Sequence, residues 1–550
     1  VNYLLNPILN ALQLSAVQVT WFGFSADAGS FSTMGGLVLA VVSLVLGGLI
    51  YAIARVSRPA TVAGGAALAG GGGIFTGGEP LSSEGRLTAG DFSSIFLQNW
   101  HEFFKWSNVD AVYLGVWSGL QAVSRGLGVV VGWMERRALA LVIVLGAVLL
   151  TAARWFTPTI AGLQTLPSPP MPLLLVLACA VASIALVLAA LFSKATRRYI
   201  PQLYVPLMIL ISSATVAGLV VVDHWLRLGL LEFGALLTVA LVWQSARTQA
   251  AKLTYLAVVL ISAVSLISSD LFMERGQPDW ARALLLTSVC VKLAAVPLFF
   301  WLLSLADEVP ALVLGLIIAV VDMAAFGELY VATQTSPALL TPQGFLLGAA
   351  AATSFLAALL MLTQRSLKRL LVLSTVEDIG FLLLGVASMN ALGAKGVIFA
   401  AATHALAKAL LFICLSGPEA DGALDGEHTG LATRYPVATF GFLFGMLAML
   451  GIPPTMGFIG RWRLYETAVQ IGWPLAAIFI LSSIFALIAY TLALTRIWWG
   501  PAHDPTPPHA DSPPRKEPFL LQAVIVALVV LVLAGGIWPD ALQMLLGGRP

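Results

Sequence analysis

Charged residues are scarce in this chain of 550 residues, of which only 10% are Asp, Glu, Lys or Arg. Soluble globular domains carry roughly 25% charged residues, because a water-facing surface needs them. Hydrophobic residues make up 59%, and the mean hydropathy is +0.92. The composition therefore excludes an ordinary soluble domain and predicts a polytopic membrane protein. The net charge of +2 is too small to favour nucleic acid, so we expect no such partner.

Cysteine is also scarce, and the motifs of redox chemistry are missing from the sequence. The three cysteines, Cys179, Cys290 and Cys414, lie inside apolar runs without ligand-like spacing. They are typical of small core residues and not of a disulfide frame, a zinc site or an iron–sulfur cluster. No glycine-rich dinucleotide loop follows a strand, and no helix carries paired histidines for haem. We expect neither a cofactor nor a metal site in this chain.

Long apolar runs are abundant instead. Each membrane-spanning helix needs about twenty apolar residues, and the sequence holds about fourteen runs of this kind. The fold class predicted is therefore an all-α polytopic membrane protein. The predicted spans are 34–56, 138–153, 171–193, 201–222, 224–244, 253–271, 283–305, 309–331, 344–363, 370–388, 395–415, 437–457, 471–496 and 519–543.

Basic residues indicate how these helices cross the membrane. Cytoplasmic loops are enriched in Lys and Arg, so the loops after the odd-numbered helices are predicted to be cytoplasmic and both termini to lie outside. No charged segment or cleavage site precedes the first span, and we expect no signal peptide. The basic residues concerned are Arg55, Arg58, Lys194, Arg197, Arg198, Arg247, Lys252, Arg365, Lys368, Arg369, Arg496, Arg515 and Lys516.

A proline cluster at 158–170 divides the chain into two predicted parts, 1–157 and 171–550. The first part contains the mixed aromatic and charged stretch Phe92–Trp106 and a second amphipathic stretch, Tyr113–Arg137. Aromatic rings prefer the membrane interface, so these stretches predict helices that lie along the lipid surface. The second part is a denser region of transmembrane helices.

Two ionisable residues lie in the middle of apolar runs. Lys292 is in Leu284–Leu305, and Glu232 is in Trp225–Trp243. A charge at membrane depth is costly, so such residues usually face a partner or a wet cavity and belong to ion or proton pathways. The alternative is an ion pair that only locks the fifth and seventh helices together.

Two predicted helices are interrupted. Pro297 follows Lys292 in the seventh helix, and the twelfth contains Gly451–Gly457 with two prolines. Non-helical backbone at this depth is tolerated only inside protein or along a wet cavity. Interruptions at corresponding places of two five-helix halves, helices four to eight and nine to thirteen, are typical of inverted transporter repeats.

Four motifs in order then resemble one family, the antiporter-like subunits of respiratory complex I, Mrp-type cation/proton antiporters and energy-converting (group 4) hydrogenases. The resemblance covers about Pro201 to Trp499, and Glu232 falls where the family carries its fifth-helix glutamate. Glu377 within Ser374–Gly380 is closer to the hydrogenase-associated branch than to complex I. The motifs are Cys290–Trp301, Arg365–Gly380, His404–Phe412 and Gly451–Arg461.

The N-terminal part carries a second resemblance. Phe75–Leu81 and Phe92–Phe96 are similar to the C-terminal end of a larger subunit of the hydrogenase branch. The chain would then join the tail of one antiporter-like subunit to a shortened second one. This departs from the family, whose first helices would be reduced or replaced.

The resemblance implies a site for proton translocation. Glu232 and Lys292 would form a switch, because each changes the proton affinity of the other. His404 suits a relay, since its ordinary pKa is near 6.5, although a packing role is an alternative. The remaining candidates are Lys408, one helical turn after His404, and Arg461, which hardly deprotonates and would tune a neighbouring carrier.

Two acidic positions leave alternatives open. Asp322 falls where several relatives have lysine, so it predicts a modified relay, a cation site or a subunit that no longer pumps. Glu377 and Asp378 lie near the start of their span, where a solvated interfacial role is an alternative to a buried one.

The resemblance implies a proton-translocating, antiporter-like subunit of a multi-subunit, redox-driven pump in the inner (cytoplasmic) membrane. Such a chain would have no redox centre, and its partners would be other membrane subunits and lipid. Two alternatives remain: a structural scaffold with a degenerate ion path, and a stand-alone cation/proton antiporter. Na⁺ is an alternative to the proton as the transported ion.

Overall fold

The computed structural model describes residues 18–20, 23–26, 29–31, 109–136, 144, 170–192, 201–340, 343–424, 429–500 and 517–539. The predicted span 34–56, most of 138–153 and the interfacial stretch Phe92–Trp106 lie outside these residues. The chain forms two compact units, one made of residues 1–33 and 124–550 and the other of residues 34–123. The predicted partition at 1–157 and 171–550 therefore stays a prediction.

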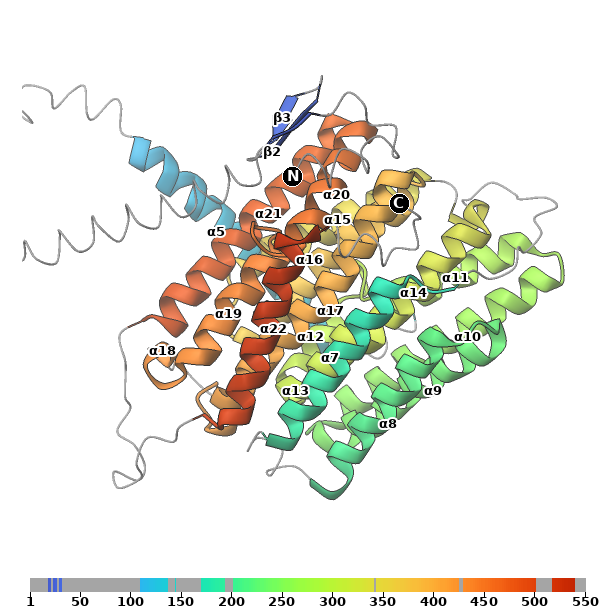
Figure 1. The fold of residues 1–550 in the computed structure, drawn as a ribbon, viewed down its shortest axis with the longest axis horizontal. Helices are drawn as coiled ribbons and strands as arrows, with labels where there is room; N and C mark the ends of the chain where they lie inside the picture. Colours follow the sequence, from blue (N-terminus) through green and yellow to red (C-terminus); the bar gives the residue numbers. More distant parts are fainter. Residues whose placement is uncertain are drawn as a thin grey trace, which may run out of the picture. The chain divides into compact units, whose positions relative to one another are not determined.

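The first four described spans are uninterrupted helices. They are α7 (Leu173–Phe192), α8 (Pro201–Val220), α9 (His224–Ser245) and α10 (Gln249–Glu274). The starts of α9 and α10 follow from their capping residues, because the side chains of Asp223 and Thr248 accept hydrogen bonds from first-turn N–H groups. Helices α8, α9 and α10 lie side by side along one edge of the bundle (Figure 1).

The predicted seventh span is broken directly after Lys292. It consists of α11 (Pro278–Lys292) and α12 (Phe300–Glu308), joined by non-helical backbone. The hydroxyl of Thr353 accepts a hydrogen bond from the N–H of Val296 at 3.1 Å and so satisfies one backbone donor that the break exposes.

The eighth span is continuous but contains a π-helical turn. It runs from α13 (Ala311–Leu316) through η2 (Ile317–Val321) to α14 (Asp322–Thr335). A short turn η3 (Pro337–Leu340) follows it. Wide π turns inside α-helices occur frequently at functional sites, and here the turn ends directly before Asp322.

The second predicted half repeats this order. It contains α15 (Gln343–Met361), α16 (Leu367–Ala387), α17 (Ala391–Ala420), the short α18 (Leu431–Arg434), then α19 (Pro436–Met449) and α20 (Gly457–Ile471) on either side of a break. Helix α21 (Trp473–Ala493) with its π turn η4 (Leu494–Trp498) and α22 (Phe519–Ile537) complete the bundle. In both halves, the fourth span is the broken one.

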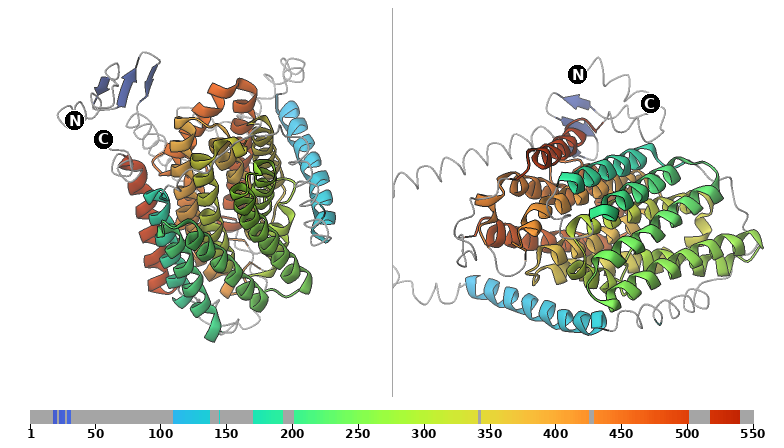
Figure 2. Two further views of the ribbon diagram at one scale, coloured as in Figure 1. Left: turned by 90° about the vertical axis from the view of Figure 1, so that its right-hand side faces the viewer. Right: turned by 90° about the horizontal axis from the view of Figure 1, so that it is seen from below.

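The buried centre of this bundle is formed by α16 and α17, which pack against each other (Figure 2). The most hydrophobic stretch of each of these two helices is completely buried, whereas in α10 and α21 only 39% of the corresponding stretch is buried. The outer helices expose large apolar side chains such as Val264, Ile484 and Val530. In a membrane, those faces contact lipid, so the protein is an all-α multi-pass membrane protein in its described core.

The N-terminal region differs from the all-α prediction at one place. Strands β1 (Gln18–Thr20), β2 (Gly23–Ala26) and β3 (Gly29–Phe31) form a small antiparallel sheet in the order β1-β2-β3. Period-2 patterning in strands this short is too weak to recognise in the sequence. Near the predicted amphipathic stretch, the structure has one continuous helix, α5 (Val109–Arg136). Its residues 114–136 are long and apolar enough to span a membrane.

Candidate functional site: two buried charge clusters

Glu232 and Lys292 form an ion pair in the interior of the first half. Lys292 Nζ lies 2.6 Å from Glu232 Oε1, and the two residues are only 7% and 9% exposed, respectively. Lys292 is the last residue of α11, where the helix dipole favours a positive charge. The break after α11 therefore places the ammonium where the helix end stabilises it.

Asp322 completes the first cluster, which consists of Glu232, Lys292 and Asp322. It is buried at the start of α14, and its charge interacts with that of Lys292 and with the hydroxyl of Tyr255. Among the described residues, none forms a hydrogen bond to Asp322. The Tyr255 hydroxyl lies 2.7 Å from Thr238 Oγ1, which continues the polar surroundings toward α9. Within the described structure, the Lys292 ammonium is thus paired with Glu232 and acts on Asp322 over a longer distance, without a hydrogen bond or ion pair.

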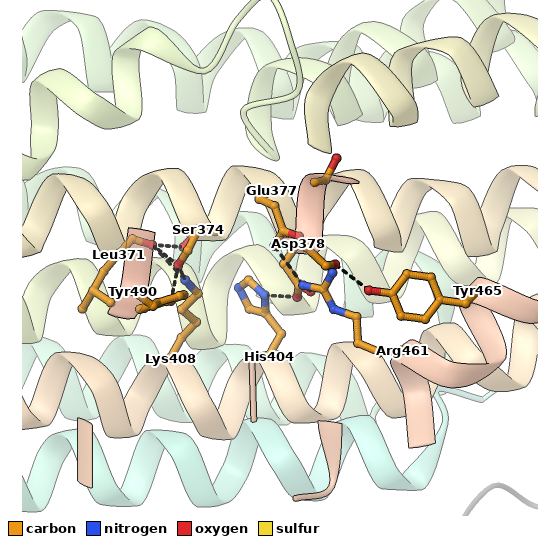
Figure 3. Close-up of polar contacts among 12 residues, drawn as sticks. Leu371, Ser374, Glu377, Asp378, His404, Lys408, Arg461, Tyr465 and Tyr490 are labelled. Atoms are coloured by element: carbon orange, nitrogen blue, oxygen red, sulfur yellow. Dashed lines mark hydrogen bonds and ion pairs between the residues drawn. The ribbon is translucent and has the colours of Figure 1, made fainter. Parts of the chain in front are cut away.

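Arg461, near the start of α20, organises a second cluster in the other half (Figure 3). Its two terminal nitrogens lie 2.9 and 2.8 Å from the oxygens of Glu377, and Nη2 lies 2.7 Å from Asp378 Oδ1. The guanidinium also stacks over the ring of Phe381 at 3.7 Å. A fork-shaped cation bound to two carboxylates and an aromatic face is held in one orientation.

His404 connects to this group through Asp378. Its Nδ1 lies 2.6 Å from Asp378 Oδ2, and the side chain is fully buried. Its Nε2 forms no hydrogen bond within the described part of the chain. A cavity of about 10 Å³ adjoins His404, Asp378 and Arg461 and extends to Met449 and Gly457 at the helix break. A space of this size accommodates about one water molecule.

Lys408 occupies the other end of the second cluster. It is fully buried one helical turn beyond His404 and donates hydrogen bonds to the carbonyl of Leu371, at 2.8 Å, and to the hydroxyl of Ser374. The Ser374 hydroxyl lies 2.6 Å from that of Tyr490. Lys408 makes no direct ion pair with any described carboxylate, but its charge interacts with those of Glu377 and Asp378. The second cluster thus consists of Glu377, Asp378, His404, Lys408 and Arg461.

The six predicted site residues therefore fall into two groups. Glu232, Lys292 and Asp322 lie in the first cluster, and His404, Lys408 and Arg461 lie in the second. Over the ranges that the structure describes, no hydrogen bond or ion pair joins Asp322 to the second cluster. A continuous path between the clusters stays a prediction. The step without a described contact is the one from Asp322 to the second cluster.

For Glu377 and Asp378, the sequence did not decide between a buried and a solvated interfacial position. Both are buried, so the solvated interfacial role considered for them is wrong within this chain. A partial signal was present, because a buried Arg461 requires a buried counter-charge. The sequence could not tell which carboxylate supplies it.

Several charged residues near helix ends hold neighbouring helices together. Lys368 Nζ lies 3.0 Å from Glu419 Oε1, and Arg369 pairs with Glu135 of α5 at 2.5 Å and with Asp307 of α12 at 2.6 Å. Glu308 accepts hydrogen bonds from the first N–H groups before α10, at 2.8 and 3.0 Å. These contacts brace the helices next to both clusters.

No metal site is evident among the residues whose positions are described. The three cysteines are buried and free.

Residues 234–486 match the family described as NADH:quinone oxidoreductase/Mrp antiporter, TM. This segment of the chain is thus similar to an antiporter-like membrane domain. The matched segment contains every predicted site residue except Glu232, which precedes it by two positions.

Curated relatives resemble about half of this chain. The NADH-quinone oxidoreductase subunit N of Moorella thermoacetica is 30% identical over 265 residues, which are 47% of this chain and 54% of the relative. The chain thus spans about half the length of the curated relatives that it matches.

Three solved structures share the fold. The structure of the Mrp complex from Dietzia sp. matches with a TM-score of 0.60 at 20% identity and covers 78% of this chain and 95% of the matched one. Respiratory complex I from Thermus thermophilus gives 0.55 at 22% identity, with coverage of 79% and 100%. An archaeal membrane-bound sulfane sulfur reductase gives 0.57 at 18% identity, with coverage of 66% and 64%. At these identities, the likeness concerns the fold alone.

Proposed function

We propose that this chain is a proton-translocating subunit of a multi-subunit, complex-I-related redox pump in the cytoplasmic membrane. The observation that carries the proposal is the buried Lys292–Glu232 pair at a helix break inside an antiporter-like fold. A buried ammonium that can exchange one carboxylate partner for another changes its proton affinity at each exchange. Asp322 supplies the second carboxylate, so Lys292 can be loaded and unloaded as its partner changes.

In the second cluster, Arg461 supplies a fixed positive charge, and His404 and Lys408 are the proton carriers. Arg461 stays protonated, and its charge stabilises Glu377 and Asp378 in their ionised forms. His404 is the carrier closest to the helix break, because its unbonded Nε2 is available next to the small cavity. Lys408 is the second carrier, since one hydroxyl and one carbonyl, and not a carboxylate, hold its ammonium.

The two halves are proposed to be inverted repeats. Each half places an acid on its second span, Glu232 and Glu377, and a cation on its broken fourth span, Lys292 and Arg461. This correspondence supports one shared design, in which the second copy has exchanged a titratable lysine for a permanent charge.

The test is proton pumping by the reconstituted assembly that contains Lys292→Ala or Glu232→Gln. Both changes break the switch, so we expect at least a tenfold loss of pumping with the assembly intact. Lys395→Ala removes an exposed lysine from the same domain and serves as the matched control. Unchanged pumping by the two variants would favour the scaffold function.

The scaffold alternative has one observation in its favour, which is the lack of a bonded connection between the two clusters in the described structure. Arg369 adds to it, because this residue ties α5 to the body of the bundle. A scaffold requires only that the bundle assembles. Pumping by variants with intact assembly therefore separates it from a translocating subunit.

The hydrogenase-associated branch is our finer proposal for the parent complex. Its support is the acidic pair Glu377–Asp378 in the motif Ser374–Gly380. Purification of the native complex decides the point, because a hydrogenase-like large subunit is expected to co-purify. Co-purification of an NADH-oxidising module would contradict this branch and leave the translocating role in place.

A further inference from the structure

A third group of charges lies outside both clusters, at the end of the first half where α9 begins and α10 and α14 end. Arg227 Nε lies 2.7 Å from Glu328 Oε1, and both residues are buried. His224 Nε2 lies 3.0 Å from Asp270 Oδ2, and both of these side chains are about one-third exposed. The group therefore extends from the protein surface to the interior.

The four residues form a connected series. Arg227 Nη2 lies 3.4 Å from His224 Nδ1, so the imidazole stands between the Asp270 carboxylate and the guanidinium. A donor facing Nδ1 leaves the ring proton on Nε2, which points toward Asp270. The arrangement links Asp270, His224, Arg227 and Glu328 in order of increasing burial.

A cavity of about 230 Å³ opens beside this series. Its lining includes His224, Asp270, Glu274 and Glu328. Glu328 is 7% exposed, and its Oε1 makes an ion pair but no hydrogen bond of good geometry. The rest of the lining is largely apolar, but a cavity of this size has room for several water molecules beside its charged groups. A buried carboxylate with spare hydrogen-bonding capacity therefore meets a space that water can fill.

The same two helices carry this group and the first cluster. Helix α9 bears both Arg227 and Glu232, and α14 bears both Glu328 and Asp322. Six residues separate Asp322 from Glu328, which corresponds to about 9 Å along a helix. The four charged residues beside the cavity thus lie beyond the first cluster, about two helical turns nearer the expected membrane surface.

We propose that this cavity is a proton-exchange site that connects the first cluster with the outer aqueous face. The proposal rests on the proposed function and on the topology expected from the basic loops, which places the start of α9 outside. A proton moves between Asp322 and the Glu328 carboxylate, then to His224 and Asp270, and from there to water. Arg227 keeps its charge throughout and holds Glu328 and His224 in position.

The charged groups around His224 come from three helices. Arg227 is on its own helix α9, Asp270 and Glu274 are on α10, and Glu328 is on α14. Protonation of His224 therefore responds to carboxylates on two neighbouring helices. An ion pair that served packing alone would need neither a titratable imidazole nor a water-sized space beside it.

The first experiment measures pumping by the native complex as a function of outer pH. Asp270→Asn and Glu328→Gln are expected to lower the rate at least fivefold and to shift its outer-pH profile, with assembly intact. Glu466→Gln changes an exposed carboxylate on the same expected face and should leave both quantities as in the wild type. Lys292→Ala is measured alongside to test the proposed function separately.

An unchanged rate and pH profile in Asp270→Asn and Glu328→Gln would overturn the exchange site, provided that Lys292→Ala has lost pumping. If Lys292→Ala pumps normally, the proposed function fails first, and the exchange site fails with it.

A second experiment does not alter the charged series. Thr335→Cys places a thiol in the cavity lining, while the native cysteines are buried and give a low background. A membrane-impermeant maleimide should label this cysteine from the outer face of sealed vesicles and not from the inner face. Failure to label from outside would overturn the proposal, even if a charge variant did not assemble.

Discussion

Arg461 and Lys408 are both buried cations of the second cluster, but their surroundings give them different roles. Arg461 is bound by two carboxylates and an aromatic ring, whereas Lys408 is held by a carbonyl and a hydroxyl. The first arrangement stabilises the charged form of a group that hardly ever loses its proton. The second leaves an ammonium whose deprotonation breaks no direct ion pair.

Removal of Arg461 should destabilise the protein. Arg461→Ala leaves Glu377 and Asp378 as buried carboxylates without their main counter-charge, a change that typically costs 3–5 kcal/mol. Arg461→Lys keeps the charge but loses the two-point contact with Glu377, so a smaller loss is expected. The thermal midpoint of the purified complex measures both. An Arg461→Ala complex that melts like the wild type would contradict the proposed fixed-charge role.

At the scale of elements, the two broken spans perform the same task. Each break ends a helix inside the bundle and leaves a cation next to it. Lys292 is the last residue of α11, and Arg461 lies near the start of α20. The break between α19 and α20 depends on Gly451, which has φ of 67°. A Cβ at this position would lie 2.5 Å from the Cβ of Arg461. Glycine is therefore needed for both the backbone turn and the approach of Arg461.

Gly451→Ala is expected to lower the stability of the complex. The left-handed conformation alone costs an ordinary residue about 1–2 kcal/mol, and the contact with Arg461 adds to it. Gly348→Ala, in the middle of α15 with open space around it, is the control and should be neutral or stabilising. Thermal midpoints of the two variants give the comparison. Equal midpoints would show that the turn does not need glycine.

Within the described residues, hydropathy and proline positions predicted most of the spanning helices and the places of both breaks, but not the separate helix α20, whose charged residues interrupt the apolar pattern. Each span of about twenty apolar residues is a strong local signal, and Pro297 and the Gly451–Gly457 segment are local too. The pairing of Arg461 with Glu377, and of Arg227 with Glu328, was not predictable, because it depends on which helix faces meet. The sheet at residues 18–31 was missed, since its strands are too short to show a period.

At the scale of the whole chain, the described core holds two charge clusters in an antiporter-like fold, with a third charged group on the first half. Arg369 braces α16, which carries Glu377 and Asp378, against α12, which follows the break after Lys292. A rigid connection of this kind lets a movement at one break change the surroundings of both clusters. Proton translocation through Lys292 requires that such movement alters the protonation of this residue.

The most direct test replaces Lys292 by arginine in the reconstituted complex. Arginine keeps the positive charge and the ion pair with Glu232 but does not release its proton in the working pH range. The account predicts an assembled, stable complex whose proton pumping falls at least tenfold, measured as acidification per turnover of the redox reaction. Pumping by Lys292→Arg at the wild-type rate would contradict the claim that Lys292 is a proton carrier and would leave it as a structural ion pair.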